Sequence, residues 1–292
     1  MHADVAAEGL YFGEGPRWHD GRLWFSDFYD HAVKTFHPDH GVQTVLELED
    51  QPSGLGWLPD GRMLVVSMQA RQVLVVDGSR VSVHADLSQL AGFHCNDMVV
   101  DAAGRAYVGN FGFDLDSALA DRGVESVLED HATAVMARID PDGTVSTAAG
   151  DLHFPNGTVI TPDGATLIVA ETLAMRLTAF DRADNGTLTN RRVWADLGGR
   201  VPDGICLDAE DMVWVANPLA PECFLVAEDP TAGDVVDVIT TSQPCFACML
   251  GGDDGRTLFM LTAENSHHGV ASANRTGRLE VARVQVPHAG RP

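Results

Sequence analysis

Basic residues are scarce in this chain, with 19 Lys and Arg against 42 Asp and Glu among 292 residues, and the formal net charge is −23. The phosphates of nucleic acids attract basic surfaces and would be repelled by a surface this acidic. The composition therefore disfavours nucleic acid as a partner. The acidity indicates a solvated surface, and it could also hold cations near a metal site.

The chain also lacks the segments that send a protein into or across a membrane. No apolar run approaches the ~18 residues that a membrane-spanning helix needs. The start, Met1-His2-Ala3-Asp4, has neither the basic residues nor the apolar stretch of a secretory signal. We therefore expect a cytoplasmic protein with no membrane association.

The five cysteines are an odd number and are not spaced as a disulfide framework. Cys245 and Cys248 form a lone C-x-x-C, without the second pair that a structural zinc site would need. Because small and apolar residues surround these two cysteines, residues 245–250 are predicted to form a buried strand and not a redox or zinc site.

Familiar catalytic signatures are missing as well. The sequence has no G-x-S-x-G elbow, no phosphate-binding P-loop and no H-E-x-x-H. Its 29 glycines, 14 prolines and 45% hydrophobic content are typical of a globular protein rich in turns.

What the chain does contain is one unit repeated six times. Each unit is a short apolar strand, an Asp-Gly-like turn and a second apolar strand, which is a strong hairpin signal. In the fourth unit, residues 155–160 lead through the Asp163-Gly164 turn to residues 167–170. Further apolar segments follow the hairpins, as at residues 72–77 and 81–84.

Four short strands in each of six units predict an all-β fold, a six-bladed β-propeller of four-stranded antiparallel blades. A β-sandwich, the alternative, would not predict six copies of one hairpin. The C-terminal strand at 278–284 has no hairpin of its own, so we expect it to share a blade with the N-terminal segment and close the ring. One domain should span residues 1–292.

An insertion at about residues 111–133 interrupts the repeat. It carries Leu115, Leu119, Val124, Val127 and Leu128 among many charges, a pattern that could hold a short helix. On a propeller this segment would lie at one end of the central channel. It is either a lid over a site or a decoration of the surface.

One polar position in the repeats is occupied by Glu14, Asn96, Asn156 or Asp203, according to the unit. The inner strands of a propeller start near its axis, so these side chains should face one another across the channel. Two carboxylates and two carboxamides form an all-oxygen set that suits a hard divalent cation such as Ca²⁺. The alternative is that the Asn-Gly and Asp-Gly pairs only make turns. His94 could face the same channel or be a structural histidine.

Four segments together resemble motifs of the regucalcin/gluconolactonase (SMP-30) family: Gly13-Glu14-Gly15-Pro16, His94-Cys95-Asn96-Asp97, Phe154-Pro155-Asn156-Gly157 and Val201-Pro202-Asp203-Gly204. The resemblance covers nearly the whole chain, from about residue 9 to about residue 286. It implies a six-bladed propeller with a catalytic divalent metal. Members of the family hydrolyse sugar lactones and related esters, and more distant relatives cleave phosphofluoridates.

The resemblance also implies roles for particular residues. Glu14, Asn156 and Asp203 match the ligands of one divalent cation, for which we expect Ca²⁺, with Zn²⁺, Mn²⁺ or Mg²⁺ as alternatives. Asp203 also matches the proposed general base. Asn96 matches a residue that contacts substrate in some members and metal in others, and Asp114 falls near an acid that contacts substrate.

One position departs from the family pattern. His94 stands where animal sugar lactonases carry an arginine that serves the sugar hydroxyls. Phe111, Phe113 and Phe154 belong near the same rim, where they either pack or contact substrate. Together these residues suggest a substrate less polar than a sugar lactone.

The sequence therefore predicts a metal-dependent lactonase or esterase whose partner is a small lactone or ester. In the expected reaction Asp203 takes a proton from the water that attacks a carbonyl polarised by the cation. His94, Asn96 and Asp114 would orient the substrate. Two alternatives remain open: a metal-stabilised binding or regulatory propeller without turnover, and a phosphotriesterase-like hydrolase.

Overall fold

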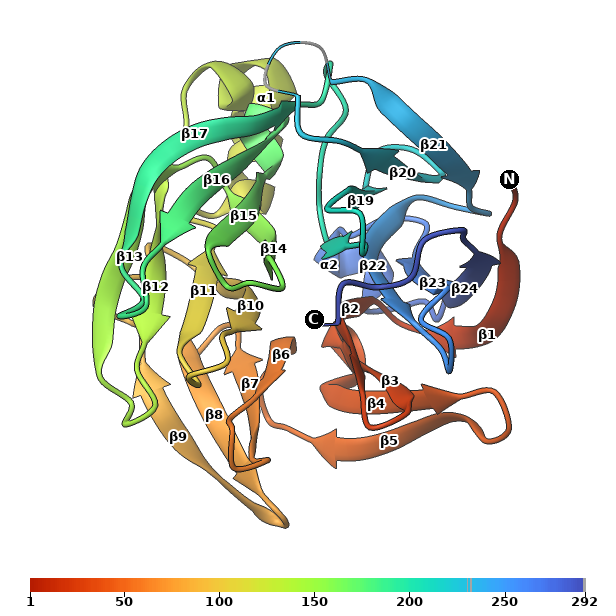
Figure 1. The fold of residues 1–292 in the computed structure, drawn as a ribbon, viewed down its shortest axis with the longest axis horizontal. Helices are drawn as coiled ribbons and strands as arrows, with labels where there is room; N and C mark the ends of the chain where they lie inside the picture. Colours follow the sequence, from red (N-terminus) through yellow and green to blue (C-terminus); the bar gives the residue numbers. More distant parts are fainter. Residues whose placement is uncertain (230, 232, 291–292) are drawn as a thin grey trace.

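Six four-stranded antiparallel sheets surround a common axis in the computed structural model, which describes residues 1–229, 231 and 233–290. Figure 1 looks along this axis, and the chain passes around it from one sheet to the next. The prediction of a six-bladed β-propeller with four-stranded blades is confirmed.

In the first five blades the strands follow chain order from the axis outward. The first two blades are β2 (Gly13–His19), β3 (Arg22–Asp27), β4 (Ala32–His37), β5 (Gly41–Glu47), and β6 (Pro52–Trp57), β7 (Met63–Ser67), β8 (Gln72–Asp77), β9 (Arg80–Asp86). The third and fourth blades are β10 (Cys95–Val100), β11 (Ala106–Asn110), β12 (Ala134–Ile139), β13 (Val145–Leu152), and β14 (Pro155–Ile160), β15 (Thr166–Glu171), β16 (Arg176–Arg182), β17 (Leu188–Asp196). The fifth blade is β18 (Ile205–Leu207), β19 (Val213–Asn217), β20 (Glu222–Val226), β21 (Val235–Thr240).

The sixth blade joins the two ends of the chain. Its inner strands are β22 (Cys245–Gly251), β23 (Thr257–Thr262) and β24 (Gly277–Arg283), and its outermost strand is β1 (Asp4–Leu10). Asp4 pairs with Val281 and Leu10 with Gly277 in an antiparallel ladder. The predicted closure of the ring by the N-terminal segment is confirmed.

In four of the six blades the inner hairpin turns at an Asp-Gly pair. Asp20 (φ 48°) and Gly21 (φ 72°) both have positive φ, as a type I′ turn between β2 and β3 requires. In the fourth blade the Asp163 carboxylate accepts a hydrogen bond from the amide of Ala165 at 2.9 Å. Local turn chemistry therefore sets the hairpins, and the apolar strands beside them pack blade against blade.

The predicted buried strand at 245–250 lies in β22, all of whose residues are buried, so that prediction is confirmed. Trp214, Tyr107, Phe25 and Phe224 are among the largest side chains that are fully enclosed in the core. All five cysteines are free and buried.

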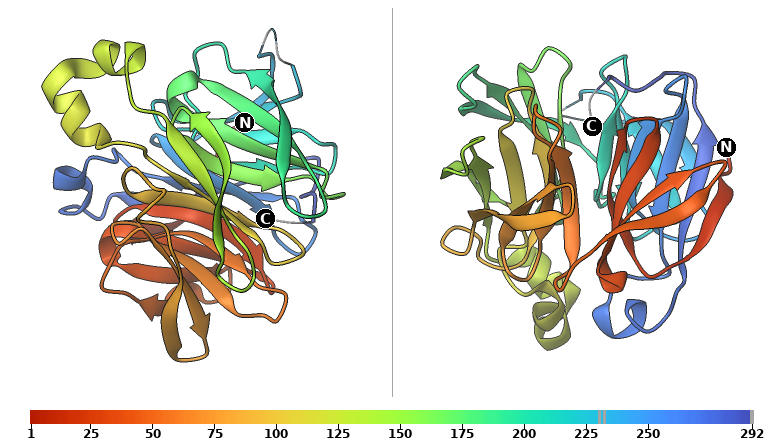
Figure 2. Two further views of the ribbon diagram at one scale, coloured as in Figure 1. Left: turned by 90° about the vertical axis from the view of Figure 1, so that its left-hand side faces the viewer. Right: turned by 90° about the horizontal axis from the view of Figure 1, so that it is seen from below.

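Among the described residues, helices interrupt the strands at four places: η1 (Phe28–Asp30), α1 (Leu115–Glu129), η2 (Thr172–Ala174) and α2 (His268–Ala271). The expected helix within residues 111–133 is present as α1, which bends at Gly123 (φ 77°). Both side views in Figure 2 show α1 and the segment around α2 projecting from the same end of the ring.

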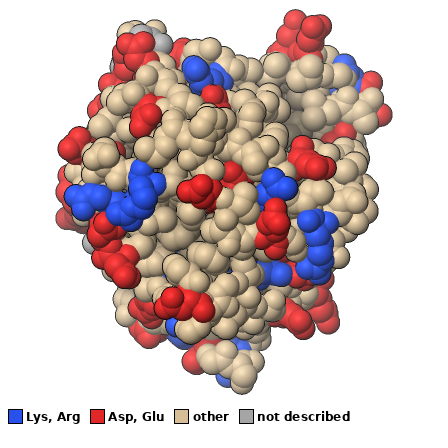
Figure 3. Space-filling view, turned by 90° about the vertical axis from the view of Figure 1, so that its right-hand side faces the viewer, with Lys and Arg blue, Asp and Glu red and all other residues tan. Residues whose placement is uncertain are grey.

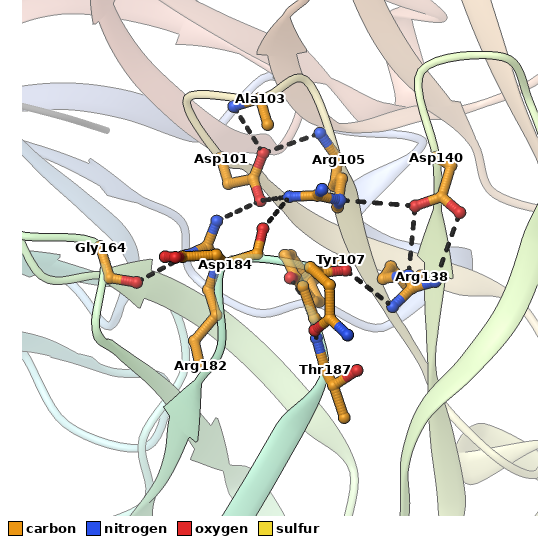
Figure 4. Close-up of polar contacts among 12 residues, drawn as sticks. Asp101, Ala103, Arg105, Tyr107, Arg138, Asp140, Gly164, Arg182, Asp184 and Thr187 are labelled. Carbon is orange, nitrogen blue, oxygen red and sulfur yellow. Dashed lines mark hydrogen bonds and ion pairs between the residues drawn. The ribbon is translucent and has the colours of Figure 1, made fainter.

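A charged network joins the third blade to the fourth (Figure 4). The enclosed carboxylate of Asp101 contacts Arg182 of β16, and its Oδ2 lies 3.4 Å from Arg105 Nη1. Arg105 and Arg138 in turn contact Asp140 at 3.6 and 3.3 Å. Burial alone would raise the pKa of Asp101, but the hydrogen bonds from Arg182 and from the Arg105 amide lower it.

Charged side chains of both signs share the surface. On the face drawn in Figure 3, basic side chains lie among acidic ones. Among the described residues, no helix is both long enough and apolar enough to span a bilayer.

Candidate metal centre

The inner strands of five blades begin with a β-bulge at the same point. The register of the hairpin shifts within residues 14–17 of β2, 52–55 of β6, 95–98 of β10, 155–158 of β14 and 245–247 of β22. A bulge places an extra residue opposite its partner strand and re-aims the side chains there. The equivalent bulges explain how Glu14, Asn96 and Asn156 come to share one direction.

Glycines next to these polar residues let neighbouring inner strands approach closely. A Cβ at Gly157 would lie 2.4 Å from the Ile205 nitrogen and 2.7 Å from the Asp203 carbonyl oxygen. The Gly157 amide donates to that oxygen at 3.2 Å. Asn156-Gly157 lies inside β14. At this pair the turn alternative is wrong, because the glycine serves a contact between blades.

The four polar side chains named from the repeats line one cavity of about 530 Å³, together with residues of α1. Asn96 Nδ2 donates to Asn156 Oδ1 at 3.0 Å, and Asn156 is also hydrogen-bonded to the carboxylate of Asp203. Glu14 reaches the same cavity from the first blade. The structure therefore brings Glu14, Asn96, Asn156 and Asp203 together, as the repeat predicted.

Two carboxylates are buried in this cavity, since Glu14 and Asp203 are each only 8% exposed. Burial raises the pKa of Glu14 well above its usual value, and the nearby carboxylates of Asp203 and Asp97 raise it further. Burial and Asp97 likewise raise the pKa of Asp203, against the hydrogen bond with Asn156. Repulsion between buried carboxylates marks a place where a cation would be stabilising.

The donor set limits the kind of cation. No group of three or more His, Cys, Asp or Glu residues is arranged to hold a metal within the described part of the chain. The candidate set has only two carboxylates, and carboxamide oxygens would have to supply the remaining protein ligands. Such a set suits a hard cation that keeps several waters.

Beside this set lies a buried ion pair that sequence reasoning missed. Arg17 Nη2 of β2 lies 2.8 Å from Asp97 Oδ1 of β10, and Arg17 Nη1 donates to the Pro16 carbonyl at 2.7 Å. Arg17 Nη2 also donates to the Met98 carbonyl. The pair connects the first blade to the third. The sequence did carry a signal, since Arg17 is a charged residue in an inner strand, three positions after Glu14.

His94 lines the cavity beside an aromatic stack. Its ring lies 4.0 Å from that of Phe93 and 6.1 Å from that of Phe111, measured between centroids. Burial lowers the pKa of His94 below its usual value, which favours the neutral imidazole. Phe111 and Phe154 also line the cavity, whereas Phe113 packs 5.9 Å from His131.

Asp114 lines the same cavity but is occupied at the start of α1. As the N-cap residue, its Oδ1 accepts from the Ser117 amide at 3.1 Å and its Oδ2 accepts from Ser117 Oγ at 2.8 Å. These two hydrogen bonds lower the pKa of Asp114. The carboxylate therefore anchors the helix, and its contact with substrate stays a prediction.

Comparison with known proteins adds a family to this geometry. A family model described as "SMP-30/Gluconolactonase/LRE-like region" matches residues 12–264. Pentonolactonase XacC of Haloferax volcanii is 26% identical and aligns over 96% of this chain and 92% of its own.

Two solved structures have a similar fold. A luciferin-regenerating enzyme has a TM-score of 0.81 at 17% identity and covers 98% of this chain and 97% of its own. A calcium-binding protein, regucalcin, from Agrobacterium tumefaciens has a TM-score of 0.79 at 20% identity and covers 100% and 96%. At these identities the two likenesses show the fold alone.

Proposed function

Because this chain belongs to the SMP-30/gluconolactonase/LRE-like family, we propose that it is a lactonase that depends on a divalent cation held by Glu14, Asn156 and Asp203. The family resemblance expected from the sequence motifs is thereby confirmed. The observation that carries the proposal is a cavity in which two buried carboxylates and two carboxamides meet. Lactone hydrolysis is supported by a relative named as a pentonolactonase and by a solved structure of similar fold named as a gluconolactonase.

Ca²⁺ is the cation that we expect, because the donors are all oxygen and because a structurally similar regucalcin is described as calcium-binding. Zn²⁺, Mn²⁺ and Mg²⁺ are the alternatives. When bound, such a cation supplies positive charge that polarises an ester carbonyl and lowers the pKa of water.

The side chains have separate parts in the proposed reaction. Asp203 accepts a proton from the water that attacks the lactone carbonyl, and the proton then passes to the ring oxygen as the acyl C–O bond breaks. The product is a hydroxy acid. Asn96 donates to the side-chain oxygen of Asn156 and so positions that carboxamide. His94 borders the same space and would orient the substrate.

The test uses protein stripped with a chelator and reloaded with Ca²⁺, Zn²⁺, Mn²⁺ or Mg²⁺, assayed on a panel of lactones. Asp203→Asn should lower kcat by a factor of about 10² to 10⁴, the usual contribution of a general base. It should also weaken cation binding measured by calorimetry, because one ligand loses its charge. Asp4→Asn, at an exposed position on β1, is the matched control.

Three results would contradict the proposal. Full lactonase activity in Asp203→Asn would show that Asp203 is neither the general base nor a necessary ligand of the cation. Tight cation binding with a raised melting temperature, but no turnover of any lactone, would identify a binding propeller instead. Turnover of organophosphate esters alone would identify the phosphotriesterase-like alternative.

A further inference from the structure

We propose that the substrate is an uncharged lactone that carries an apolar alkyl or aryl substituent. This inference rests on the proposed lactonase function and specifies its substrate class. The cavity of about 530 Å³ is within the usual range for small-molecule sites and exceeds what the polar set at its base requires. The residues that line its walls and its mouth indicate which substituents of a substrate would fit in the remaining volume.

One wall is a cluster of aromatic rings from the first and sixth blades. Phe12 lies 4.7 Å from Phe246 in an edge-to-face arrangement and 5.4 Å from Phe28, measured between centroids. Tyr29 packs 6.0 Å from Phe12. All four residues line the cavity, and the phenylalanines are buried. This wall offers mainly aromatic hydrocarbon to a ligand, and the Tyr29 hydroxyl donates to the Ser266 carbonyl at 3.0 Å.

A second group of rings that line the cavity comes from the third and fourth blades. Phe111 stacks on Phe154 with 4.5 Å between centroids and an interplanar angle of 25°. Phe93 stacks on His94 at 4.0 Å. These rings line the same cavity as Asn96 and Asn156, so a substituent on the lactone ring would lie against them while the ester reaches the polar set.

The mouth of the cavity carries exposed apolar side chains. Leu119 and Val124 of α1 are 37% and 59% exposed, and Leu219, after β19, is 75% exposed. All three line the cavity. Single apolar residues on a surface need no explanation, but several around one cavity mark a ligand site. A substituent that extends from the ester would cover Leu119, Val124 and Leu219 and shield them from water.

The charges of the cavity argue against an anionic ligand. Among the described residues that line it there is no Lys or Arg, while Glu14, Asp203, Asp114 and Asp116 all contribute carboxylates. A phosphate or carboxylate on the substrate would find no Lys or Arg among these residues and would be repelled by the carboxylates of the rim.

Several polar groups of the cavity already have protein partners. Both Asp114 oxygens accept from Ser117, and Asn96 is hydrogen-bonded to Ser53 and Asn156. Hydroxyl groups of a sugar-like ring that lay against the aromatic rings would be buried without partners, which is costly.

The test is a series of lactones of one ring size, substituted with methyl through hexyl, compared with polyhydroxylated lactones of the same ring. With Ca²⁺-loaded protein, kcat/KM should rise about fourfold for each methylene that enters the cavity. Non-hydrolysable lactams with the same substituents, titrated by calorimetry, should tighten by a similar ratio. The polyhydroxylated lactones should be the poorest substrates.

Leu219→Ser and Val124→Ser should reduce the preference for hexyl over methyl lactone by several fold, because they remove apolar surface from the mouth. Val83→Ser on β9 is the matched control, since Val83 is 54% exposed and does not line the cavity. Faster turnover of polyhydroxylated lactones, with no dependence on chain length, would overturn this inference and leave the lactonase function intact. No turnover of any lactone would overturn both.

Discussion

The buried pair of Arg17 and Asp97 offers a quantitative test of how this ring is held together beside its candidate metal centre. Replacing Arg17 by Met removes the positive charge but keeps an unbranched apolar side chain in the strand. Asp97 would then remain buried near Glu14 and Asp203, whose pKa values it already raises. The variant therefore leaves three carboxylates with no compensating cation.

The expected loss of stability can be worked out from the distance between the two charges. At the Arg17–Asp97 separation of 2.8 Å, and with an effective dielectric constant of about 20, the gross attraction is about 6 kcal/mol. The cost of burying both charges offsets part of this attraction in the parent protein. Removing only one partner typically costs about 3–5 kcal/mol. For 292 residues that loss corresponds to a fall in melting temperature of about 5–8 °C.

The assay is chemical and thermal unfolding in the presence of a chelator, with Arg17→Met, Asp97→Asn and the double variant compared in a double-mutant cycle. The double variant should recover about 2 kcal/mol or more relative to the sum of the single losses, because it leaves no unpaired charge. A loss below about 1 kcal/mol in Arg17→Met, or strict additivity in the cycle, would refute this account.

Three further predictions concern other parts of the molecule. Asp101→Asn should cost about 3 kcal/mol in urea unfolding at pH 7. The pKa of Asp101 is lowered in the folded state, so its carboxylate stabilises the fold at pH values above the unfolded pKa of about 4. This contribution is lost as the pH falls through the folded-state pKa. The stabilities of the parent protein and the variant should therefore converge in acid. Ca²⁺ at 100 times its Kd should raise the free energy of unfolding by about 2.7 kcal/mol, and Glu14→Gln should lose most of that gain in calorimetry. Gly157→Ala should destabilise the protein by about 1–3 kcal/mol in the same assay, because the new Cβ would lie 2.4 Å from the Ile205 nitrogen; unchanged stability would contradict the close approach.

The blades could be predicted because their signals are local. Asp20-Gly21 and Asp163-Gly164 are turn sequences flanked by apolar strands, and they form the hairpins in the structure. The convergence of Glu14 with Asn156 could also be predicted, since a repeat places equivalent residues at equivalent points of a ring. The repeat was therefore enough to predict the propeller fold and to predict that Glu14 and Asn156 line one cavity.

Other features depend on contacts that no local pattern describes. Arg17 and Asp97 are 80 positions apart, and their pairing depends on bulges that turn both strands at the axis. The family resemblance predicts a substrate contact for Asp114, and the structure adds that this residue caps α1 through Ser117. The spacing of Asp114 and Ser117 is an ordinary capping signal, but its meaning depends on where the helix begins.

The pairing of β1 with β24 has a consequence for how the protein is made. The N-terminal residues bind at the far end of the chain, since Asp4 faces Val281 and the Ala3 amide donates to the Thr240 carbonyl at 3.0 Å. During synthesis the first strand must wait, unpaired, until the last blade has left the ribosome. Contacts so distant in sequence form slowly, and until they do β24 offers an open edge to other chains. The nascent ring is therefore most vulnerable to aggregation at the single seam that completes it.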